Sequence, residues 1–327
     1  MLLPALARAM AAMAALFAAS AALAEDPSHY PGQAVHMVVP FPAGGPADIL
    51  ARALGQRLSD MWRQPVVIEN RPGANTAVAA AHVAKAPPDG YTLFVVMDVT
   101  MVLNPLVAKD LPYDPLRDFA PITLLAKNTS LLSVRASDGP ATLQELIARG
   151  RANPGKLNYG AGIITTQLAA ALFNREAGIV AQLVPYQGSP PTVMGLMTGS
   201  VDYIVDGAAS SIPLIQAGKM RALAKLNNGR VEGLPELKSL AEASGIPALE
   251  DVSTWIGLVA PAGAAPALID KLQRDVAAVY ASPNFQQTME KAGINAINSS
   301  PGELGQFVRS EQIRWGKVVK DSGLAPN

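Results

Sequence analysis

The feature that most constrains the fold is an alternation of short apolar runs with stretches of helical periodicity. Residues 35–41 form a continuous apolar run of strand length, and after Pro46 the residues Leu50, Leu54 and Leu58 recur at the spacing of one helix face. The alternation continues with a strand, a helix and a strand over residues 65–69, 74–86 and 91–97. This order predicts a parallel sheet with right-handed crossovers.

The same alternation resumes further along the chain. Further strands are predicted over residues 131–135, 157–160, 181–186, 201–205 and 220–226. The helices between them are predicted over residues 143–151, 166–177, 190–197 and 212–217. A last strand at 254–260 precedes three closing helices at 266–281, 284–292 and 302–319. Two such units in 327 residues predict two α/β lobes.

The late strand at 254–260 indicates that the chain crosses between the lobes more than once. We expect lobe 1 to comprise residues 25–126 and 254–327, and lobe 2 to comprise residues 127–253. The crossings are expected near residues 127–128 and 253–254. Two crossings form a hinge that permits the lobes to close on a ligand.

The first 24 residues have the character of a signal peptide. Arg8 precedes an apolar run that ends in Ala22-Leu23-Ala24, the small-x-small pattern of a cleavage site. The run has about 15 residues, whereas a bilayer-spanning helix needs about 20. Glu25 follows where a lipoprotein would carry Cys. We therefore expect residues 1–24 to be removed and the mature protein to be soluble and periplasmic.

Composition and motifs argue against several functions. Lys+Arg and Asp+Glu number 26 each, so there is no basic footprint for nucleic acid. The absence of Cys excludes thiol catalysis, and the three His residues are not spaced as metal ligands. No catalytic motif is present, and nothing pairs Asp48, Asp98 or Asp206 for acid–base work. We expect no catalytic residue, cofactor or metal.

The loop 41–45 after the first strand is a candidate anion site, because parallel α/β sheets bind ligands beyond the carboxyl ends of their strands. Gly44 and Gly45 allow the backbone to approach a ligand, and Pro46 suits the first helical turn. The free N–H groups of that turn lie at the positive end of the helix dipole. The alternative is a tight turn that Asp48 closes by capping its own helix; Asp48 and Arg52 can also simply pair at i,i+4.

The second half of the chain contains three similar corners. Gly160-Ala161-Gly162 follows a strand, and Thr165 and Thr166 can cap the next helix. The sequence 186–189 and the pair Asp206-Gly207 also follow strands. Each corner alone is more typical of an ordinary turn, but several corners across one cleft favour a binding site.

Seven segments of the chain resemble the substrate-binding proteins of tripartite tricarboxylate transporters, the Bug or TctC family. They are residues 38–48, 67–74, 86–93, 111–115, 154–159, 184–189 and 217–224. The resemblance covers essentially the whole mature chain. It implies a type II-like two-lobe periplasmic binding fold with mostly parallel sheets. It also implies a carboxylate ligand held by backbone N–H groups of the loops 41–48 and 160–166, and delivery to a two-subunit membrane permease.

The resemblance and the loops together define a set of predicted ligand-binding residues. These are Phe41, Ala43, Gly44, Gly45, Asp48, Asp98, Thr100, Gly162, Thr165, Thr166, Tyr186 and Asp206. The protein is expected to act as a monomer.

Two departures from the family pattern bear on the ligand. Met101 stands where the family often has His, and the loop 160–167 is short and lacks His. We therefore predict a less polar monocarboxylate, either aromatic or bearing an amine that Asp98 could meet. Two other functions stay open: a ligand sensor for a membrane signalling protein, and a secreted enzyme whose turnover would depend on Asp98 or Asp206.

Overall fold

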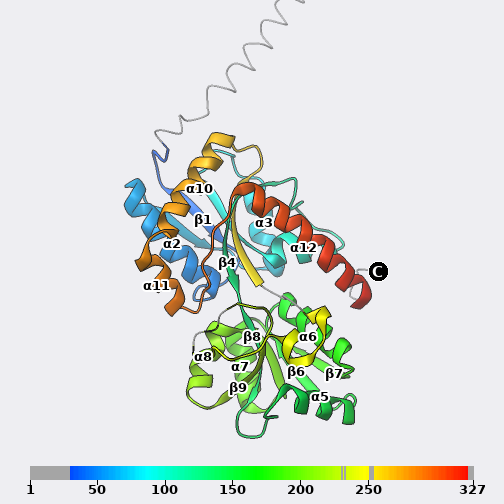
Figure 1. Cartoon of the computed structure of the whole chain (residues 1–327). Helices are drawn as coiled ribbons and strands as arrows, with labels where there is room; N and C mark the ends of the chain where they lie inside the picture. The colour runs from blue at the N-terminus through cyan, green and yellow to red at the C-terminus, as the bar shows by residue number, and fades with distance from the viewer. Residues whose placement is uncertain (1–29, 230, 232, 250–253, 323–327) are drawn as a thin grey trace, which may run out of the picture.

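The computed structural model describes residues 30–229, 231, 233–249 and 254–322. The predicted signal peptide at 1–24 lies outside the described residues, and so does the crossing at residue 253. Figure 1 shows two lobes, one above the other, with β4 running from the upper lobe into the lower one. We call the part built on the first sheet lobe 1 and the part built on the second sheet lobe 2.

Lobe 1 is built on a five-stranded sheet of order β2-β1-β3-β10-β4. Its strands are β1 (Val35–Val39), β2 (Val66–Asn70), β3 (Thr92–Met97), β4 (Phe119–Asn128) and β10 (Thr254–Pro261). Its helices are α2 (Pro46–Trp62), α3 (Ala77–Val83), α4 (Asn104–Val107), α10 (Pro266–Tyr280), α11 (Pro283–Lys291) and α12 (Pro301–Ser322). A 3₁₀ turn, η1 (Ala74–Thr76), precedes α3, and a π-helix, η2 (Val99–Leu103), follows β3.

Lobe 2 repeats the same plan with the order β7-β6-β8-β5-β9. Its strands are β5 (Ser130–Arg135), β6 (Leu157–Ala161), β7 (Ala181–Pro185), β8 (Tyr203–Gly207) and β9 (Met220–Lys225). Its helices are α5 (Leu143–Ala152), α6 (Ile164–Ala177), α7 (Ser189–Thr198), α8 (Ala208–Gln216), α9 (Leu240–Ser244) and the 3₁₀ turn η3 (Pro247–Leu249). In each sheet the fourth strand in the order runs antiparallel to both neighbours, so the sheets are mixed and mostly parallel, as predicted.

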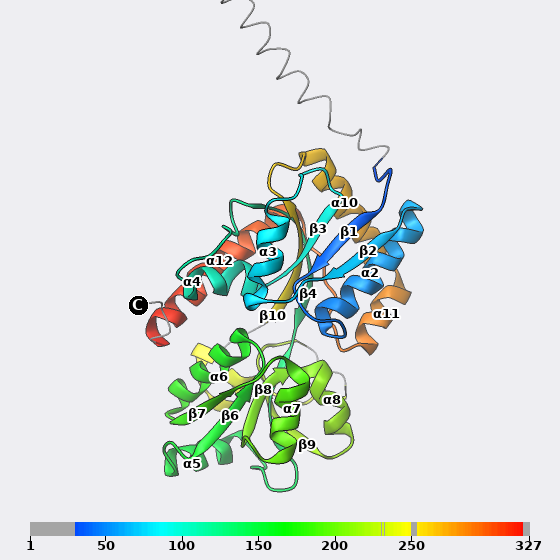
Figure 2. The ribbon, with the colours of Figure 1, turned by 180° about the vertical axis from the view of Figure 1, so that it is seen from behind.

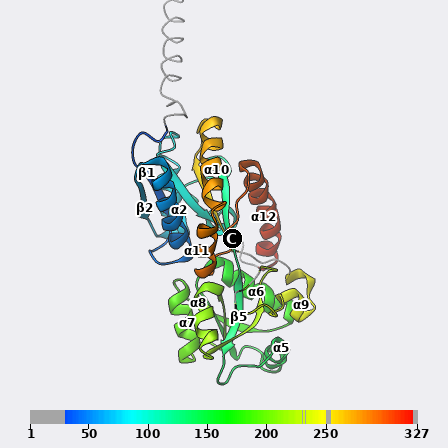
Figure 3. The ribbon, with the colours of Figure 1, turned by 60° about the vertical axis from the view of Figure 1, so that its left-hand side comes forward.

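The continuous apolar character of the strands reflects burial on both faces of each sheet. On one face of the first sheet, Met37 and Val95 pack with Leu54 of α2 and Leu272 of α10. The side chains of β1 and β3 that point to the opposite face form a second buried cluster with side chains of α3, η2 and α12. Figures 2 and 3 show these helices on the two sides of the sheet.

The strand β4 was not predicted from the sequence, because Pro121 interrupts its apolar run and cannot donate a ladder hydrogen bond. The structure accommodates Pro121 because β4 is at the edge of the sheet and pairs there with β10 next to a register shift. β4 ends at Asn128 and β5 begins at Ser130, so only Thr129 separates the two sheets on this path. The predicted lobe bounds stay a prediction.

The predicted helix over 74–86 is shorter in the structure. Ala74, Asn75 and Thr76 all have positive φ, at 44°, 49° and 77°, and α3 begins only at Ala77. Such a left-handed run of residues with side chains is costly and needs outside support. The support comes from Asn104, whose Nδ2 donates to the backbone oxygen of Asn75 at 2.6 Å.

Candidate functional site

The first part of the candidate site is the loop that leads into α2. Gly44 has a φ of +91°, and a Cβ added to Gly44 or Gly45 would meet nothing within 4 Å. Gly44 is therefore required for its backbone conformation and not for close packing. α2 is 17 residues long and has Pro46 in its first turn, and no side chain among the described residues caps its N-terminal N–H groups. The loop is open, and the positive end of the helix is available to an anion.

Asp48 stabilises this loop from within lobe 1. Its Oδ2 accepts hydrogen bonds from the Gly44 N–H and from Arg52 Nε, both at 2.9 Å. Its Oδ1 accepts from Asn70 Nδ2 at 2.9 Å and forms the expected i,i+4 ion pair with Arg52. Burial alone would raise the pKa of Asp48, but the hydrogen bonds from Arg52, Gly44 and Asn70 outweigh it and lower that pKa. Asp48 thus closes the turn through the Gly44 N–H and pairs with Arg52, but it does not cap the first-turn N–H groups of α2.

Asn70 fixes the beginning of the same loop, although it was not among the predicted ligand-binding residues. Its Nδ2 also donates to the backbone oxygen of Phe41 at 2.9 Å. Phe41 itself is half-buried and packs against the core of lobe 1, whereas Ala43 is exposed. The position of Asn70 at the last residue of β2, beside the end of β1, was the only signal that could have revealed this role.

In lobe 2, the loop after β6 is packed closely against the loop before α7. A Cβ added to Gly162 would lie 2.6 Å from the backbone of Gly188, so only glycine fits there. The Gly188 N–H donates to the Gly162 oxygen at 2.9 Å. Thr166 Oγ1 donates to the backbone oxygen of Ile163 at 2.9 Å and so closes the first turn of α6. Gly162 and Thr166 thus shape the corner through local contacts.

The remaining predicted residue at the end of β7, Tyr186, is turned into its own lobe. A Cβ added to Gly195 of α7 would lie 2.1 Å from the Tyr186 hydroxyl, so the ring lies directly against α7. Gly195 therefore has to be glycine in order to accept the ring. This placement gives Tyr186 a packing role within lobe 2.

Two buried carboxylates lie at the carboxyl ends of the central strands of the two sheets. Asp98 comes directly after β3 and Asp206 lies near the end of β8; they are 0% and 3% exposed. Ser189 Oγ donates to Asp206 Oδ1 at 2.7 Å. Among the described residues, neither Asp98 Oδ1 nor Asp206 Oδ2 has a hydrogen-bond partner. Burial raises the pKa of Asp98 to about 7 and that of Asp206 to about 6.

Thr165 joins the lobes instead of capping α6. Its Oγ1 donates a short hydrogen bond to Oδ2 of Asp98, which belongs to lobe 1. α12 and η2 of lobe 1 also contact α6 here, and one buried apolar cluster contains Val102 of lobe 1 and Leu168 of lobe 2. The structure thus brings Asp98 and Thr165 together, although they are 67 residues apart in sequence.

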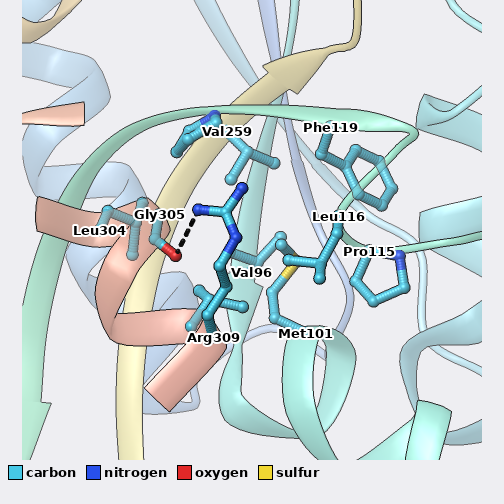
Figure 4. A pocket seen from close by; sticks show the side chains of 11 residues that line it. Val96, Met101, Pro115, Leu116, Phe119, Val259, Leu304, Gly305 and Arg309 are labelled. Atoms are coloured by element: carbon cyan, nitrogen blue, oxygen red, sulfur yellow. Dashed lines mark hydrogen bonds between the residues drawn. The ribbon is translucent and has the colours of Figure 1, made fainter. Parts of the chain in front are cut away.

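Thr100 and Met101 both lie inside lobe 1. Thr100 Oγ1 donates to Thr76 Oγ1 at 2.9 Å, within the network that holds η1. Figure 4 shows Met101 beside an apolar cavity of about 60 Å³ between the sheet and α12, near Leu304 and Arg309. Because Met101 is 4% exposed and contributes to this packing, its placement does not support the argument that it changes the polarity of a ligand site.

A crevice of about 250 Å³ separates the lobes next to the hinge. Thr129, Ala208 and Ile212 line it from lobe 2, and Gln286, Glu290 and Asn295 line it from lobe 1. None of the predicted ligand-binding residues lines this crevice, although Ala208 lies two positions beyond Asp206. Thr129 Oγ1 donates a hydrogen bond to Asn227 Oδ1, and Asn227 Nδ2 donates to the backbone oxygen of Asn128. These two bonds connect the hinge to the segment after β9.

Two kinds of feature are absent from the described part of the chain. No cluster of three or more His, Asp or Glu side chains there could hold a metal ion. No helix within those residues has both the length and the apolar character to cross a membrane.

Two lobes of corresponding strand arrangement, joined by a hinge and facing each other across the carboxyl ends of their parallel strands, define a two-lobe periplasmic binding protein. The profile of the tripartite tricarboxylate transporter family receptor, TctC, matches residues 50–324. The chain belongs to this family, whose members are periplasmic solute-binding receptors.

Individual relatives are similar over nearly their whole length. A UPF0065 protein from the tcbD-tcbE intergenic region of Pseudomonas sp. (strain P51) is 34% identical, over 98% of this chain and 95% of that protein. Rpa4515 of R. palustris, solved with adipate, is 36% identical with a TM-score of 0.84, over 91% of this chain and 100% of that one. MatC of Rhodopseudomonas palustris, solved with bound malate, is 30% identical with a TM-score of 0.79, over 89% of this chain and 100% of that one.

Proposed function

We propose that the protein is an extracytoplasmic receptor that captures a small carboxylate between its lobes. It then delivers this ligand, as a monomer, to a two-subunit membrane permease of the tripartite type. Membership of the receptor family supports this function, and so do the adipate and malate seen with two structures that are 36% and 30% identical. The signal peptide predicted at 1–24 fits the same compartment. No catalytic step is part of the proposal.

The observation that carries the proposal is the uncapped N-terminus of α2. Its first-turn N–H groups have no intrahelical acceptor and, in the part of the chain that the structure describes, no side-chain cap; the Gly44-Gly45 loop before them is open. We assign the ligand carboxylate to the N–H groups of Gly45, Ala47 and Asp48. The Asp48 side chain is committed to Gly44, Arg52 and Asn70, and it acts by holding the loop in position.

The other predicted residues divide into two groups in this proposal. Phe41, Thr100, Gly162, Thr166 and Tyr186 shape the walls through contacts within their own lobes. Ala43, Asp98 and Asp206 are left to face the ligand, and Thr165 holds Asp98 in position. Closure takes place about Thr129 and the second crossing near residue 254, with lobe 1 at 25–126 and 254–327 and lobe 2 at 127–253. Strands that continue directly from one sheet into the other suit such a hinge.

Native mass spectrometry of the purified protein tests the first part of the proposal, because it detects a co-purified acid. Calorimetric titration with adipate, malate, succinate and hexanoate then measures affinity. Gly44→Ala should weaken binding at least about tenfold, because it strains the loop in front of α2. Gly155→Ala is the matched control: Gly155 has a φ of +74° and equally open surroundings, but it lies before β6 in lobe 2. Equal affinities of the two variants would contradict the proposed carboxylate position.

Delivery to a permease needs a separate measurement. Cells that express the permease genes should accumulate the labelled acid only when this receptor is present. Accumulation at the same rate without the receptor would contradict the proposed partner, while leaving the binding function intact.

A further inference from the structure

Asp98 lies where lobe 1 meets the beginning of α6. It directly follows β3, and its Oδ2 accepts a hydrogen bond from Thr165 Oγ1 in the first turn of that helix. Both side chains are buried, with 0% and 1% exposure. Asp98 is therefore enclosed by the two lobes together.

The N-terminus of α6 is a second position that would otherwise suit an anion. The helix has 14 residues, and its N-cap residue, Ile163, has no side-chain acceptor for the first-turn N–H groups. The partial positive charge there favours a carboxylate. In this structure the carboxylate that approaches the first turn is the chain's own Asp98. A ligand carboxylate at this position would meet a like charge at close range.

The other oxygen of Asp98 has an unused acceptor capacity. Within the described residues, Asp98 Oδ1 accepts no hydrogen bond although it is fully buried. A buried acceptor without a donor is unfavourable, and a ligand hydroxyl or ammonium group would supply the missing hydrogen bond. The same group would not suffer repulsion from Asp98.

We propose that Asp98 determines the ligand class: it occupies the anion position at α6, so the receptor takes acids with one carboxylate and a hydrogen-bond donor at the far end. This inference rests on the proposed function, because the single carboxylate is the one bound at α2. It assigns the donor, a hydroxyl or an ammonium group, to Asp98 Oδ1. Dicarboxylates of the same length are rejected by charge.

Three acids with the same six-carbon chain test this inference: adipate, hexanoate and 6-aminohexanoate. At pH 8, calorimetric titration of the wild-type protein should show 6-aminohexanoate binding at least about tenfold more tightly than adipate, because the second carboxylate of adipate is repelled by Asp98. Hexanoate should lie between them. Asp98→Asn, which keeps the shape of the side chain, should reduce the preference for 6-aminohexanoate over adipate at least about tenfold.

Asp202→Asn is the matched control, because Asp202 precedes β8 and accepts from the Asn158 N–H at the opposite end of the sheet. It should leave the preference unchanged. Adipate binding most tightly to the wild-type protein, or an unchanged preference in Asp98→Asn, would overturn the inference and leave the proposed function standing. Failure of adipate, malate, hexanoate and 6-aminohexanoate to bind either protein would overturn the proposed function and this inference with it.

The wild-type protein provides a second measurement that needs no variant. Burial, with a smaller contribution from the Glu311 carboxylate on α12, raises the pKa of Asp98 to about 7 against the opposing hydrogen bonds from Thr165 on α6 and the Trp255 backbone N–H on β10. Glu311 is itself beside Arg314, at 3.4 Å. Lowering the pH from 8 to 6.5 should therefore neutralise much of Asp98 and reduce the preference for 6-aminohexanoate at least about threefold. A constant preference over this range would also overturn the inference.

Discussion

The Thr165 hydroxyl on α6 donates a hydrogen bond to the Asp98 carboxylate at the end of β3, so two buried polar side chains connect the lobes. Thr165→Val keeps the volume and removes the donor, which leaves both oxygens of Asp98 without a donor from lobe 2. We expect this to cost about 1–3 kcal/mol of unfolding free energy at pH 8, measured by urea denaturation. Thr198→Val, at an exposed hydroxyl of α7, should change it by less than about 0.5 kcal/mol. Equal effects of the two substitutions would contradict the role of the bond.

The two buried carboxylates predict how stability depends on pH. The pKa values of Asp98 and Asp206 are raised in the folded protein to about 7 and about 6, whereas an unfolded Asp titrates near 3.9. The folded state therefore binds these protons more tightly, and their stabilising contribution is fully present below the unfolded pKa and is lost progressively as the pH rises from there through the folded pKa values. The unfolding free energy should be on the order of 2 kcal/mol higher at pH 5.5 than at pH 8.

Asp98→Asn should remove most of that pH dependence, because the amide does not titrate. Asp202→Asn serves as the comparison. Carboxyls with a lowered pKa, such as Asp48, do not change ionisation between pH 5.5 and 8 and do not affect the result. Urea denaturation at the two pH values measures the difference, and a wild-type protein that is more stable at pH 8 would contradict the assignment.

A second buried network holds the strained residues before α3. Tyr113 OH donates to the Thr100 oxygen at 2.7 Å and accepts from Asn104 Nδ2 at 3.0 Å, and Asn104 also holds Asn75. Asn104→Ala should destabilise the protein by about 2–4 kcal/mol, because it releases the left-handed turn and leaves a buried hydroxyl without its donor. Tyr113→Phe, which keeps the ring, should cost about 1–2 kcal/mol. Thermal or urea unfolding that shows no loss for Asn104→Ala would contradict this role.

The Asp48 side chain affects carboxylate affinity in two opposite ways, through its negative charge and through its hold on the loop. Removal of a negative charge next to an anion site would by itself improve carboxylate binding. Because Asp48 holds Gly44 and is held by Asn70, we expect Asp48→Ala to weaken binding at least about tenfold by releasing the loop. Calorimetric titration with the tightest acid measures this, and a gain in affinity would show that Asp48 acts through its charge.

Much of the fold was predictable because burial on both faces gives parallel strands long apolar runs. Such runs predicted the strands around residues 35–39 and 92–97. The helices that begin at Pro46 and Pro266 were also predicted. β4 was missed because Pro121 is tolerated only at the edge of a sheet, and sequence alone does not show which strand is at the edge. The start of α3 was placed too early because Asn104, 29 residues further on, holds the turn before it.

The candidate site was predictable only in its local parts. Gly44 and Gly162 follow strands, and their position in the chain predicts a loop at the carboxyl edge of a sheet. The contact between Asp98 and Thr165 depends on how the lobes meet, and no spacing in the sequence encodes it. The role of Asn70 was hidden for a similar reason, because it depends on β2 lying beside β1.

The absence of Cys from the chain allows a direct measurement of closure. Val78→Cys on α3 and Met194→Cys on α7, both at exposed positions in different lobes, provide two sites for spin labels. Pulsed electron paramagnetic resonance then measures the distance between the labels without ligand and with a saturating carboxylate. Closure of the lobes on an acid predicts a shorter and narrower distance distribution with ligand. An identical distribution with a bound acid would contradict the central claim.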